Sequence, residues 1–274
     1  DTDSENTIKK LETLGSLYKR IPLTICLFCP KKQSVEADCC KHFSPPMYLI
    51  EFIHSLKEIE KLSEWEQKLL LFSCYESYLN PSIIRPCVLL NGTLCSIYNA
   101  RPFSCRMYPS YPKKEWEKRL KKVSEDWAIS INEIPMKDQC PNVKIEGNIG
   151  KISTEEENKI FREISDIDIS LFENLDFGKE VVHSASTYLS FDAHYLLMKI
   201  GPDSLEELSD IRVMLMKENE KIKTGKFEEN RLAIIKNQVK DLLLDIKNKI
   251  FSNEKLGDNI NENDQGESGI SHIG

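Results

Sequence analysis

The chain lacks any long apolar stretch. Although 40% of its 274 residues are hydrophobic, no run approaches the roughly 18 residues that a membrane-spanning helix requires. The N-terminal stretch also lacks the basic start and apolar block of a secretory signal peptide. We therefore expect a cytoplasmic protein without a membrane span. Charged residues make up 30% of the chain, and this balance excludes collagen-like and fully disordered chains.

The common catalytic and nucleotide-binding motifs are also missing. The chain has no glycine-rich phosphate loop, no H-E-x-x-H helix and no G-x-S-x-G nucleophile elbow. A glycine motif for S-adenosylmethionine is absent as well. The sequence therefore assigns no reaction, and it leaves open whether the protein is an enzyme.

Acidic residues are in excess, and they are unevenly distributed. Residues 1–150 carry 21 Lys+Arg and 19 Asp+Glu, a net charge of +2. Residues 151–274 carry 16 and 25, a net charge of −9, and the two halves sum to −7. A net-acidic protein is a poor candidate for nucleic-acid binding. We interpret the acidic half as a surface for a protein partner, and the basic stretch at residues 113–122 as a solvated helix face with helically spaced glutamates.

Helical patterns dominate the sequence, whereas alternating strand patterns are scarce. A serine followed three residues later by a glutamate forms a capping box, and this pair marks helix starts at Ser63 and Ser204. The second start directly follows Gly201-Pro202. Apolar residues then recur every three or four positions from residue 232 to residue 250, which predicts a helix that packs on its own domain.

The segments with the least helical pattern hold most of the cysteines. Residues 26–40 and 80–112 are rich in proline and are predicted to be loops. A short hairpin is favoured in the second loop, after Cys87 and around Gly92. We predict a mainly α fold in which an irregular, metal-stapled, cysteine-rich N-terminal region packs with helices and is followed by a C-terminal helical region.

The cysteines also suggest where the chain divides. All nine lie between Cys26 and Cys140, and the last 134 residues contain none. We expect a cysteine-cluster metal-binding domain over residues 1–150 and a helical region over residues 151–252. Residues 253–274 have few large apolar side chains and are predicted to be a disordered tail.

Three interpretations of the cysteines compete. In the first, they bind metal: the Cys26-x2-Cys29 pair places two thiolates on one turn, at the roughly 2.3 Å reach of a zinc–sulfur bond. In the second they form disulfides, but the odd number and the missing secretion signal weigh against this. In the third they are small buried apolar residues, which suits Cys74 within its aromatic helical context. The metal interpretation is favoured.

A resemblance to a known family supports the interpretation of the cysteines as metal ligands. Residues 87–109 contain the element Cys-Ile-Tyr-x-x-Arg-Pro-x-x-Cys-Arg-x-Tyr-Pro, which resembles the signature of the YkgJ-family cysteine-cluster proteins. These proteins are also described as the CxxCxxCC zinc- or iron-chelating domain. Cys26-x2-Cys29 with Cys39-Cys40 resembles the first motif of that family, although nine residues separate Cys29 from Cys39, a longer spacing than expected. The resemblance spans about residues 20–145.

The resemblance implies a zinc or iron centre, with an iron–sulfur cluster as one form of the latter. The predicted metal ligands, which would form one or two thiolate sites, are Cys26, Cys29, Cys39, Cys40, Cys87, Cys95, Cys105 and Cys140. Because a domain of this kind also occurs in flagellin lysine methylases, the alternative function is an iron–sulfur redox or methyl-transfer enzyme.

Other candidate residues lie near the cysteines. Arg101 and Arg106 flank the last dense segment and are predicted to bind the cofactor by donating N–H groups to thiolate or sulfide. The competing interpretation is that both arginines are ordinary surface or ion-paired residues. His42 is a minor ligand candidate, whereas His54, His183 and His194 are interpreted as ordinary helix residues.

Overall fold

The structure is a computed structural model. It describes residues 4–21, 24–25, 44–80, 86–91, 94–107, 113–127, 144–145, 152–172, 188–223 and 229–251. The predicted disordered tail at residues 253–274 lies outside these described residues.

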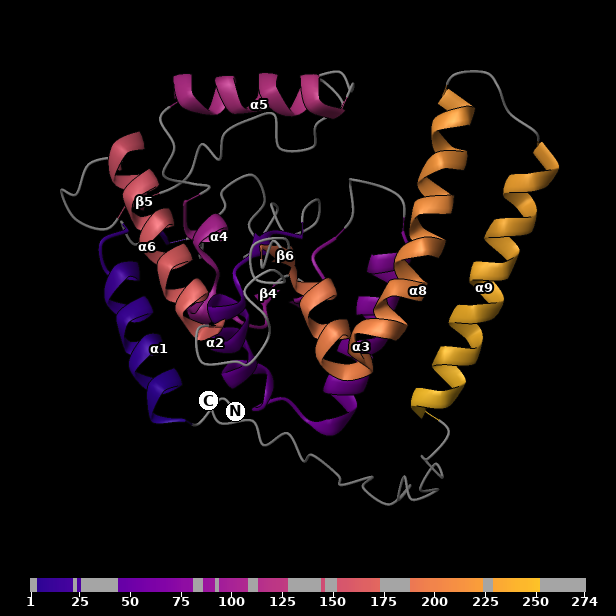
Figure 1. Cartoon of the computed structure of the whole chain (residues 1–274), viewed down its shortest axis with the longest axis horizontal. Helices are drawn as coiled ribbons and strands as arrows, with labels where there is room; N and C mark the ends of the chain where they lie inside the picture. The colour runs from indigo at the N-terminus through magenta and orange to yellow at the C-terminus, as the bar shows by residue number, and fades with distance from the viewer. Residues whose placement is uncertain are drawn as a thin grey trace, which may run out of the picture.

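Helices make up most of the described structure (Figure 1). They are α1 (Glu5–Tyr18), α2 (Leu49–Ile59), α3 (Glu64–Leu79), α4 (Phe103–Met107), α5 (Lys113–Trp127), α6 (Thr154–Phe172), α8 (Phe191–Lys223) and α9 (Glu229–Phe251), with a 3-10 turn η2 (Tyr98–Ala100). The prediction of a mainly α fold is confirmed. No described helix combines the length and the apolar character needed to cross a membrane.

The strands are two residues long and form antiparallel pairs. They are β1 (Thr24–Ile25), β2 (Pro46–Met47), β3 (Leu90–Asn91), β4 (Leu94–Cys95), β5 (Lys144–Ile145) and β6 (Leu189–Ser190). β1 pairs with β5 and β2 pairs with β6, whereas β3 and β4 form a hairpin. Two of the three pairs therefore join segments that are distant in the sequence.

Both predicted helix starts are recognisable in the structure. The Ser63 hydroxyl accepts a hydrogen bond from the Glu66 amide, and the Glu66 carboxylate accepts one from the Ser63 amide, so that α3 begins with a complete capping box. At Gly201 the backbone has a φ of 80°, which breaks α8 into two helical pieces before Pro202. Glycine adopts this left-handed conformation at low cost, and this explains why the break occurs there.

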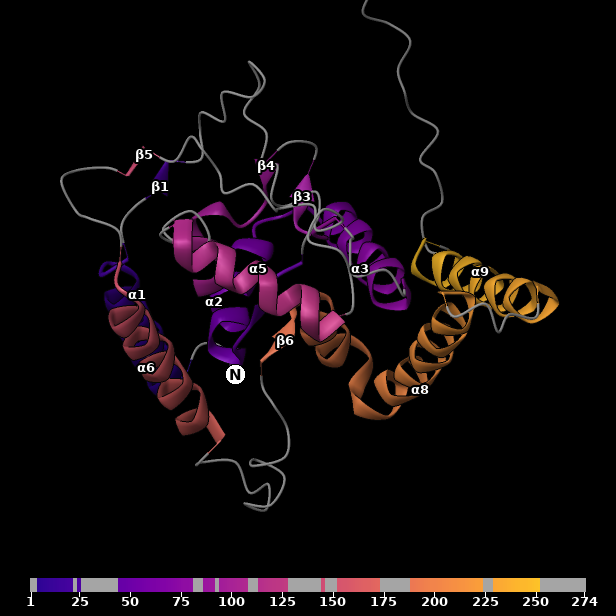
Figure 2. The ribbon, with the colours of Figure 1, turned by 90° about the horizontal axis from the view of Figure 1, so that it is seen from above.

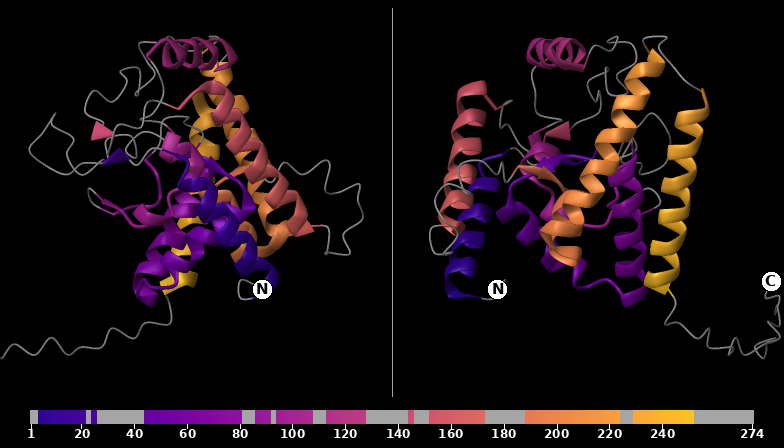
Figure 3. Two further views of the ribbon diagram at one scale, coloured as in Figure 1. Left: turned by 90° about the vertical axis from the view of Figure 1, so that its left-hand side faces the viewer. Right: turned by 45° about the vertical axis from the view of Figure 1, so that its right-hand side comes forward.

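One hydrophobic core, the α8 core, joins α3 to the first part of α8. Its buried members are Met47, Phe52, Leu56, Ile59, Leu70, Cys74, Tyr78, Leu79, Cys87, Leu89, Ile97, Ala100, Phe191, Ala193, Tyr195, Leu196 and Leu208. The predicted apolar stripe of α9 packs against it through Val239 and Leu242. Views from several directions show α3, α8 and α9 side by side (Figures 1 and 3).

A second hydrophobic core, the α6 core, joins α1, α2, α4 and α6. Its buried members are Leu11, Leu14, Leu17, Tyr18, Ile21, Tyr48, Ile50, Phe103, Met107, Ile152, Ile160 and Ile164. Helix α2 supplies side chains to both cores, because Phe52 faces the α8 core and Ile50 faces the α6 core. Helix α2 therefore lies between the two helical groups (Figure 1).

Helix α5 lies over the body of the molecule, as the view from above shows (Figure 2). Trp116 packs against the α6 core, and Arg119 forms a bidentate contact of 2.8 and 2.9 Å with the buried carboxylate of Glu157. Lys114 and Lys118 are exposed. This agrees with the interpretation of the basic stretch as a solvated helix face.

Elements from both sides of residue 150 meet in each core. Ile160 and Ile164 of α6 complete the α6 core, and Phe191 and Leu196 of α8 complete the α8 core. The predicted division near residue 150 means that each part would fold on its own. It stays a prediction, and expression of residues 1–150 alone would test it.

Candidate metal centre

The structure describes three of the eight predicted ligands, namely Cys87, Cys95 and Cys105. The other five lie outside the described residues, as does His42; they are Cys26, Cys29, Cys39, Cys40 and Cys140. The geometry of the candidate centre is therefore built here from the segment between Cys87 and Met107.

The β3–β4 hairpin holds Cys87 and Cys95 in one small unit. Leu90 pairs with Cys95 across the hairpin, and the Leu90 amide donates a 3.0 Å hydrogen bond to the carbonyl of Cys87. The Ser96 amide closes the base by donating to the Leu89 carbonyl at 2.8 Å. The predicted hairpin after Cys87 is confirmed, and it brings two thiols that are eight positions apart onto the same turn structure.

Cys87 and Cys95 differ in their exposure. Cys87 is 5% exposed and belongs to the α8 core, whereas Cys95 is partly buried and packs against that core. A thiolate loses hydration when it is buried, and a bound cation offsets that loss. The hairpin thus presents one buried sulfur and one more accessible sulfur.

Cys105 lies in the short helix α4, although the sequence predicted a loop here. The amides of Cys105 and Arg106 both donate to the Pro102 carbonyl, at 3.0 and 3.1 Å. Proline is compatible with the first turn of a helix because its missing N–H is not needed there. The loop prediction was wrong at this point because proline was taken only as a breaker.

The chain from Cys95 to Met107 crosses from one core to the other. Ile97 and Ala100 are buried in the α8 core, whereas Phe103 and Met107 are buried in the α6 core. The hairpin cysteines therefore belong to the α8 core, and Cys105 is held beside the α6 core. A metal ion bound by both groups of thiols would link the two cores.

Arg106 lies where the chain passes from the α8 core to the α6 core. Its Nε donates a 2.7 Å hydrogen bond to the Arg101 carbonyl, and its Nη2 donates a 2.6 Å bond to the Asn99 carbonyl. Burial lowers the pKa of the guanidinium, while nearby Tyr18, Glu51 and Cys105 act in the opposite direction. The two hydrogen bonds hold Arg106 against the backbone of the segment, and its guanidinium interacts electrostatically with the Cys105 sulfur.

Arg101 is also buried, and its guanidinium lies 3.9 Å from the centre of the Tyr98 ring. This is a cation–π contact, which packs the Tyr98 ring against the arginine. That either arginine binds a cofactor stays a prediction.

Cys74 occupies a different environment. It is fully buried in the interior of α3 and belongs to the α8 core. The interpretation of Cys74 as a core residue is confirmed.

The described histidines are packed into the structure in different ways. His194 is buried, stacks on Phe52 with ring centres 5.1 Å apart, and donates from Nε2 to the Met47 carbonyl at 3.0 Å. His54 lies 6.1 Å from the Tyr18 ring, and burial lowers its pKa, as does the charge of Arg106. Both are helix residues, as predicted, whereas His183 lies outside the described residues.

Glu51 is a residue of this region that the sequence interpretation missed. Its side chain is 1% exposed and accepts hydrogen bonds from Tyr18, Tyr48 and Phe103. A glutamate in the apolar run after Met47 was the available signal. Burial raises the pKa of this carboxyl, although its three hydrogen bonds act in the opposite direction.

Thiolate sulfur suits zinc or iron rather than hard cations. Within the described part of the chain, no three or more Cys, His, Asp or Glu side chains come together as a metal-binding group. Five of the eight predicted ligands lie outside that part. Cys87 and Cys95 share the hairpin, but the described structure does not gather these two and Cys105 into one three-residue group, and the ligand set stays a prediction.

The comparisons with known proteins identify this region. No curated protein and no solved structure matches the chain. One family model matches, the CxxCxxCC family described as "Putative zinc- or iron-chelating domain", over residues 29–126. This segment contains the hairpin, η2, α4 and the helices α2 and α3. The resemblance drawn from the cysteine motifs is confirmed at the level of this domain family: residues 29–126 match the model of the CxxCxxCC domain.

Proposed function

We propose that this protein binds zinc or iron through thiolates supplied by its cysteine segments. The domain match supports metal binding, and the thiol ligands proposed are Cys26, Cys29, Cys39, Cys40, Cys87, Cys95, Cys105 and Cys140. The observation that carries the proposal is the short bridge between the two cores, which holds Cys87 and Cys95 on a hairpin and Cys105 on α4.

The proposed role of the metal is first of all structural. The regular structure of the described residues between Cys87 and Met107 consists of two-residue strands, one 3-10 turn and a five-residue helix. Such elements form few internal hydrogen bonds, and an isolated two-stranded hairpin is marginally stable. Structural zinc sites contribute on the order of 10 kcal/mol to folding. A metal bound here would hold the hairpin and α4 in place between the cores.

The charges around α4 fit thiolate ligands. Arg106 directly follows Cys105, and its guanidinium interacts electrostatically with that sulfur, while Arg101 lies four residues before Cys105 in the sequence. Positive charge near cysteine favours the thiolate, which is the form that binds metal. In a reducing cytoplasm these thiols remain available to a metal, and we place the protein there. The acidic half, with its net charge of −9, is proposed to contact a protein partner.

Metal analysis of the full chain, purified without oxygen, tests the proposal. We expect stoichiometric zinc or iron, and a strong loss of metal in Cys95→Ser. A protein that contains no tightly bound zinc or iron, and that takes up neither metal after reduction, would contradict the proposal.

The absorption spectrum of the same sample separates a zinc site from an iron–sulfur cluster. A colourless protein with stoichiometric zinc supports the structural site and rules out the cluster enzyme. A brown protein with broad absorption in the visible range supports a cluster, and it would make the redox or methyl-transfer alternative the one to pursue.

A further inference from the structure

The carboxylate of Glu51 joins three elements of the α6 core. Its Oε1 accepts hydrogen bonds from the Tyr18 hydroxyl and the Phe103 amide, each at 2.6 Å, and its Oε2 accepts from the Tyr48 amide at 2.9 Å. Tyr18 is the last residue of α1, Glu51 lies in the first turn of α2, and Phe103 begins α4. A buried carboxylate that replaces its hydration with three hydrogen bonds fixes the relative position of its donors.

These hydrogen bonds matter most for α4, because so short a helix is not stable without contacts to the rest of the molecule. The helix contains five residues, and the amides of Cys105 and Arg106 donate to the carbonyl of Pro102, which precedes the helix. Its remaining anchors are external: Phe103 and Met107 are buried in the α6 core, and the Ser104 hydroxyl donates to the Pro46 carbonyl at 3.1 Å. The bond from the Phe103 amide to Glu51 lies two residues before Cys105.

Tyr18 contacts both sides of the α4 turn. Its hydroxyl donates to Glu51, and its ring lies 4.1 Å from the guanidinium carbon of Arg106, the residue that follows Cys105. Arg106 in turn holds the carbonyls of Asn99 and Arg101. Tyr18 therefore supports the position of Cys105 in two ways. It binds Glu51, which holds the Phe103 amide two residues before Cys105, and it packs against Arg106, the residue after Cys105.

We propose that Tyr18 and Glu51 are positioning residues that hold Cys105 in place for the metal. This inference rests on the proposed metal-binding function. Neither residue is assigned as a ligand. Tyr18 lies outside the matched domain at residues 29–126, so the proposal makes α1 part of the metal-binding unit although the family model does not include it.

The conservative variant Tyr18→Phe tests the proposal, because it removes the hydroxyl and keeps the ring over Arg106. Tyr78→Phe is a matched control: Tyr78 is a buried tyrosine of the α8 core, and its ring lies 4.9 Å from the guanidinium carbon of Arg212. The full chain would be stripped of metal and titrated with Zn²⁺ against a chromophoric chelator, and separately with Co²⁺.

We expect Tyr18→Phe to weaken Zn²⁺ binding by about 10-fold or more, the usual effect of losing a group that orients a ligand. The thiolate-to-cobalt absorption band at saturating Co²⁺ should shift or weaken, whereas Tyr78→Phe should keep the wild-type affinity and band. A purely structural role would lower the unfolding temperature of Tyr18→Phe without changing the cobalt band.

Glu51→Gln provides a second variant should Tyr18→Phe lose its helical circular dichroism. It removes the charge and keeps the size of the side chain, and it should also lower the affinity and alter the cobalt band. Wild-type affinity and band in a folded variant would overturn the positioning role and leave the metal-binding function standing. A wild-type protein that binds neither zinc nor iron would overturn both.

Discussion

The hydroxyl of Ser77 donates a 2.9 Å hydrogen bond to Oδ2 of Asp192, and both side chains are buried. Ser77 lies in the last part of α3 and Asp192 in the first turn of α8, so the bond joins residues 115 positions apart. It lies where the α3 and α8 helices, from opposite sides of residue 150, pack into one core. A buried carboxylate is costly unless its oxygens are hydrogen-bonded.

Replacement of Ser77 by alanine tests this connection. We expect Ser77→Ala to lower the free energy of unfolding by about 1–3 kcal/mol, because the variant removes a donor from a buried carboxylate. Urea unfolding followed by circular dichroism measures the change. Ser16→Ala is the control, since the Ser16 hydroxyl bonds to the Glu12 carbonyl on an exposed helix face. Equal midpoints for the two variants would contradict the prediction.

Cys74 and Cys95 should respond differently to substitution. Cys74→Ala removes one buried atom from the α8 core and should cost about 1 kcal/mol, with metal content unchanged. Cys95→Ser should lose most of the bound metal. Elemental analysis with thermal unfolding checks both variants. Equal metal loss in Cys74→Ala would show that Cys74 belongs with the ligands.

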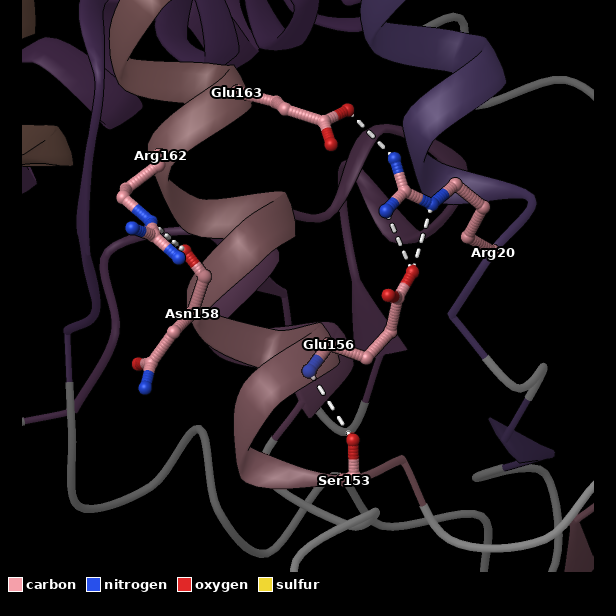
Figure 4. A network of polar contacts seen from close by, with 6 residues as sticks. All are labelled: Arg20, Ser153, Glu156, Asn158, Arg162 and Glu163. Carbon is pink, nitrogen blue, oxygen red and sulfur yellow. Dashed lines mark hydrogen bonds and ion pairs between the residues drawn. The ribbon is translucent and has the colours of Figure 1, made fainter.

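Arg20 connects the end of α1 to α6 by two ion pairs (Figure 4). Its guanidinium lies 2.6 Å from a carboxylate oxygen of Glu156 and 2.6 Å from one of Glu163. These side chains are about one-third exposed, so water and salt screen the pairs. We expect Arg20→Met to cost less than about 1 kcal/mol, with a smaller effect at high salt.

The unfolding midpoint of Arg20→Met is measured at low and at high salt, and Arg162→Gln is the control. Arg162 lies on α6, the helix that carries Glu156 and Glu163, and its Nε donates to the Asn158 carbonyl of that same helix at 3.2 Å (Figure 4). Its replacement should change the unfolding midpoint little at either salt concentration. A loss of several kcal/mol in Arg20→Met that does not depend on salt would show that the pairs are not screened.

His54 predicts a pH dependence of stability. Burial lowers its pKa below the ordinary value of 6.5, and the charge of Arg106 acts in the same direction. The unfolded chain therefore binds a proton at His54 more readily than the folded chain does. The contribution of neutral His54 to the stability of the fold is fully present above pH 6.5, and it is lost as the pH falls through the lower pKa of the folded state.

The substitution His54→Gln removes this titration. Between about pH 7.5 and about pH 5.5, the wild-type protein should lose more stability than the variant. Urea unfolding at both pH values checks the difference. If the variant lost as much stability as the wild type on acidification, other groups would account for the pH dependence.

The sequence alone determined several features of the protein. Apolar spacing and the capping box at Ser63 predicted a mainly α fold, and the break at Gly201-Pro202 was predicted as a helix start. The turn after Cys87 predicted the hairpin. The element around Cys95 and Cys105 predicted the resemblance to the CxxCxxCC family, and a family model matches residues 29–126. These features are local, because a few neighbouring residues determine each of them.

The tertiary structure alone decided how these pieces meet. The sequence treated the cysteine-containing half and the acidic half as separate units, whereas elements of both fill each hydrophobic core. The sequence analysis missed the link between Tyr18 and Glu51 because these residues are 33 positions apart, and Phe103, which also bonds to Glu51, is 52 positions from it. Apolar burial is not directional, and no local pattern specifies which distant face a helix will cover. Spacing thus predicted which cysteines are candidates for the metal, and long-range packing placed Cys87 and Cys95 at the α8 core and the helix that carries Cys105 at the α6 core.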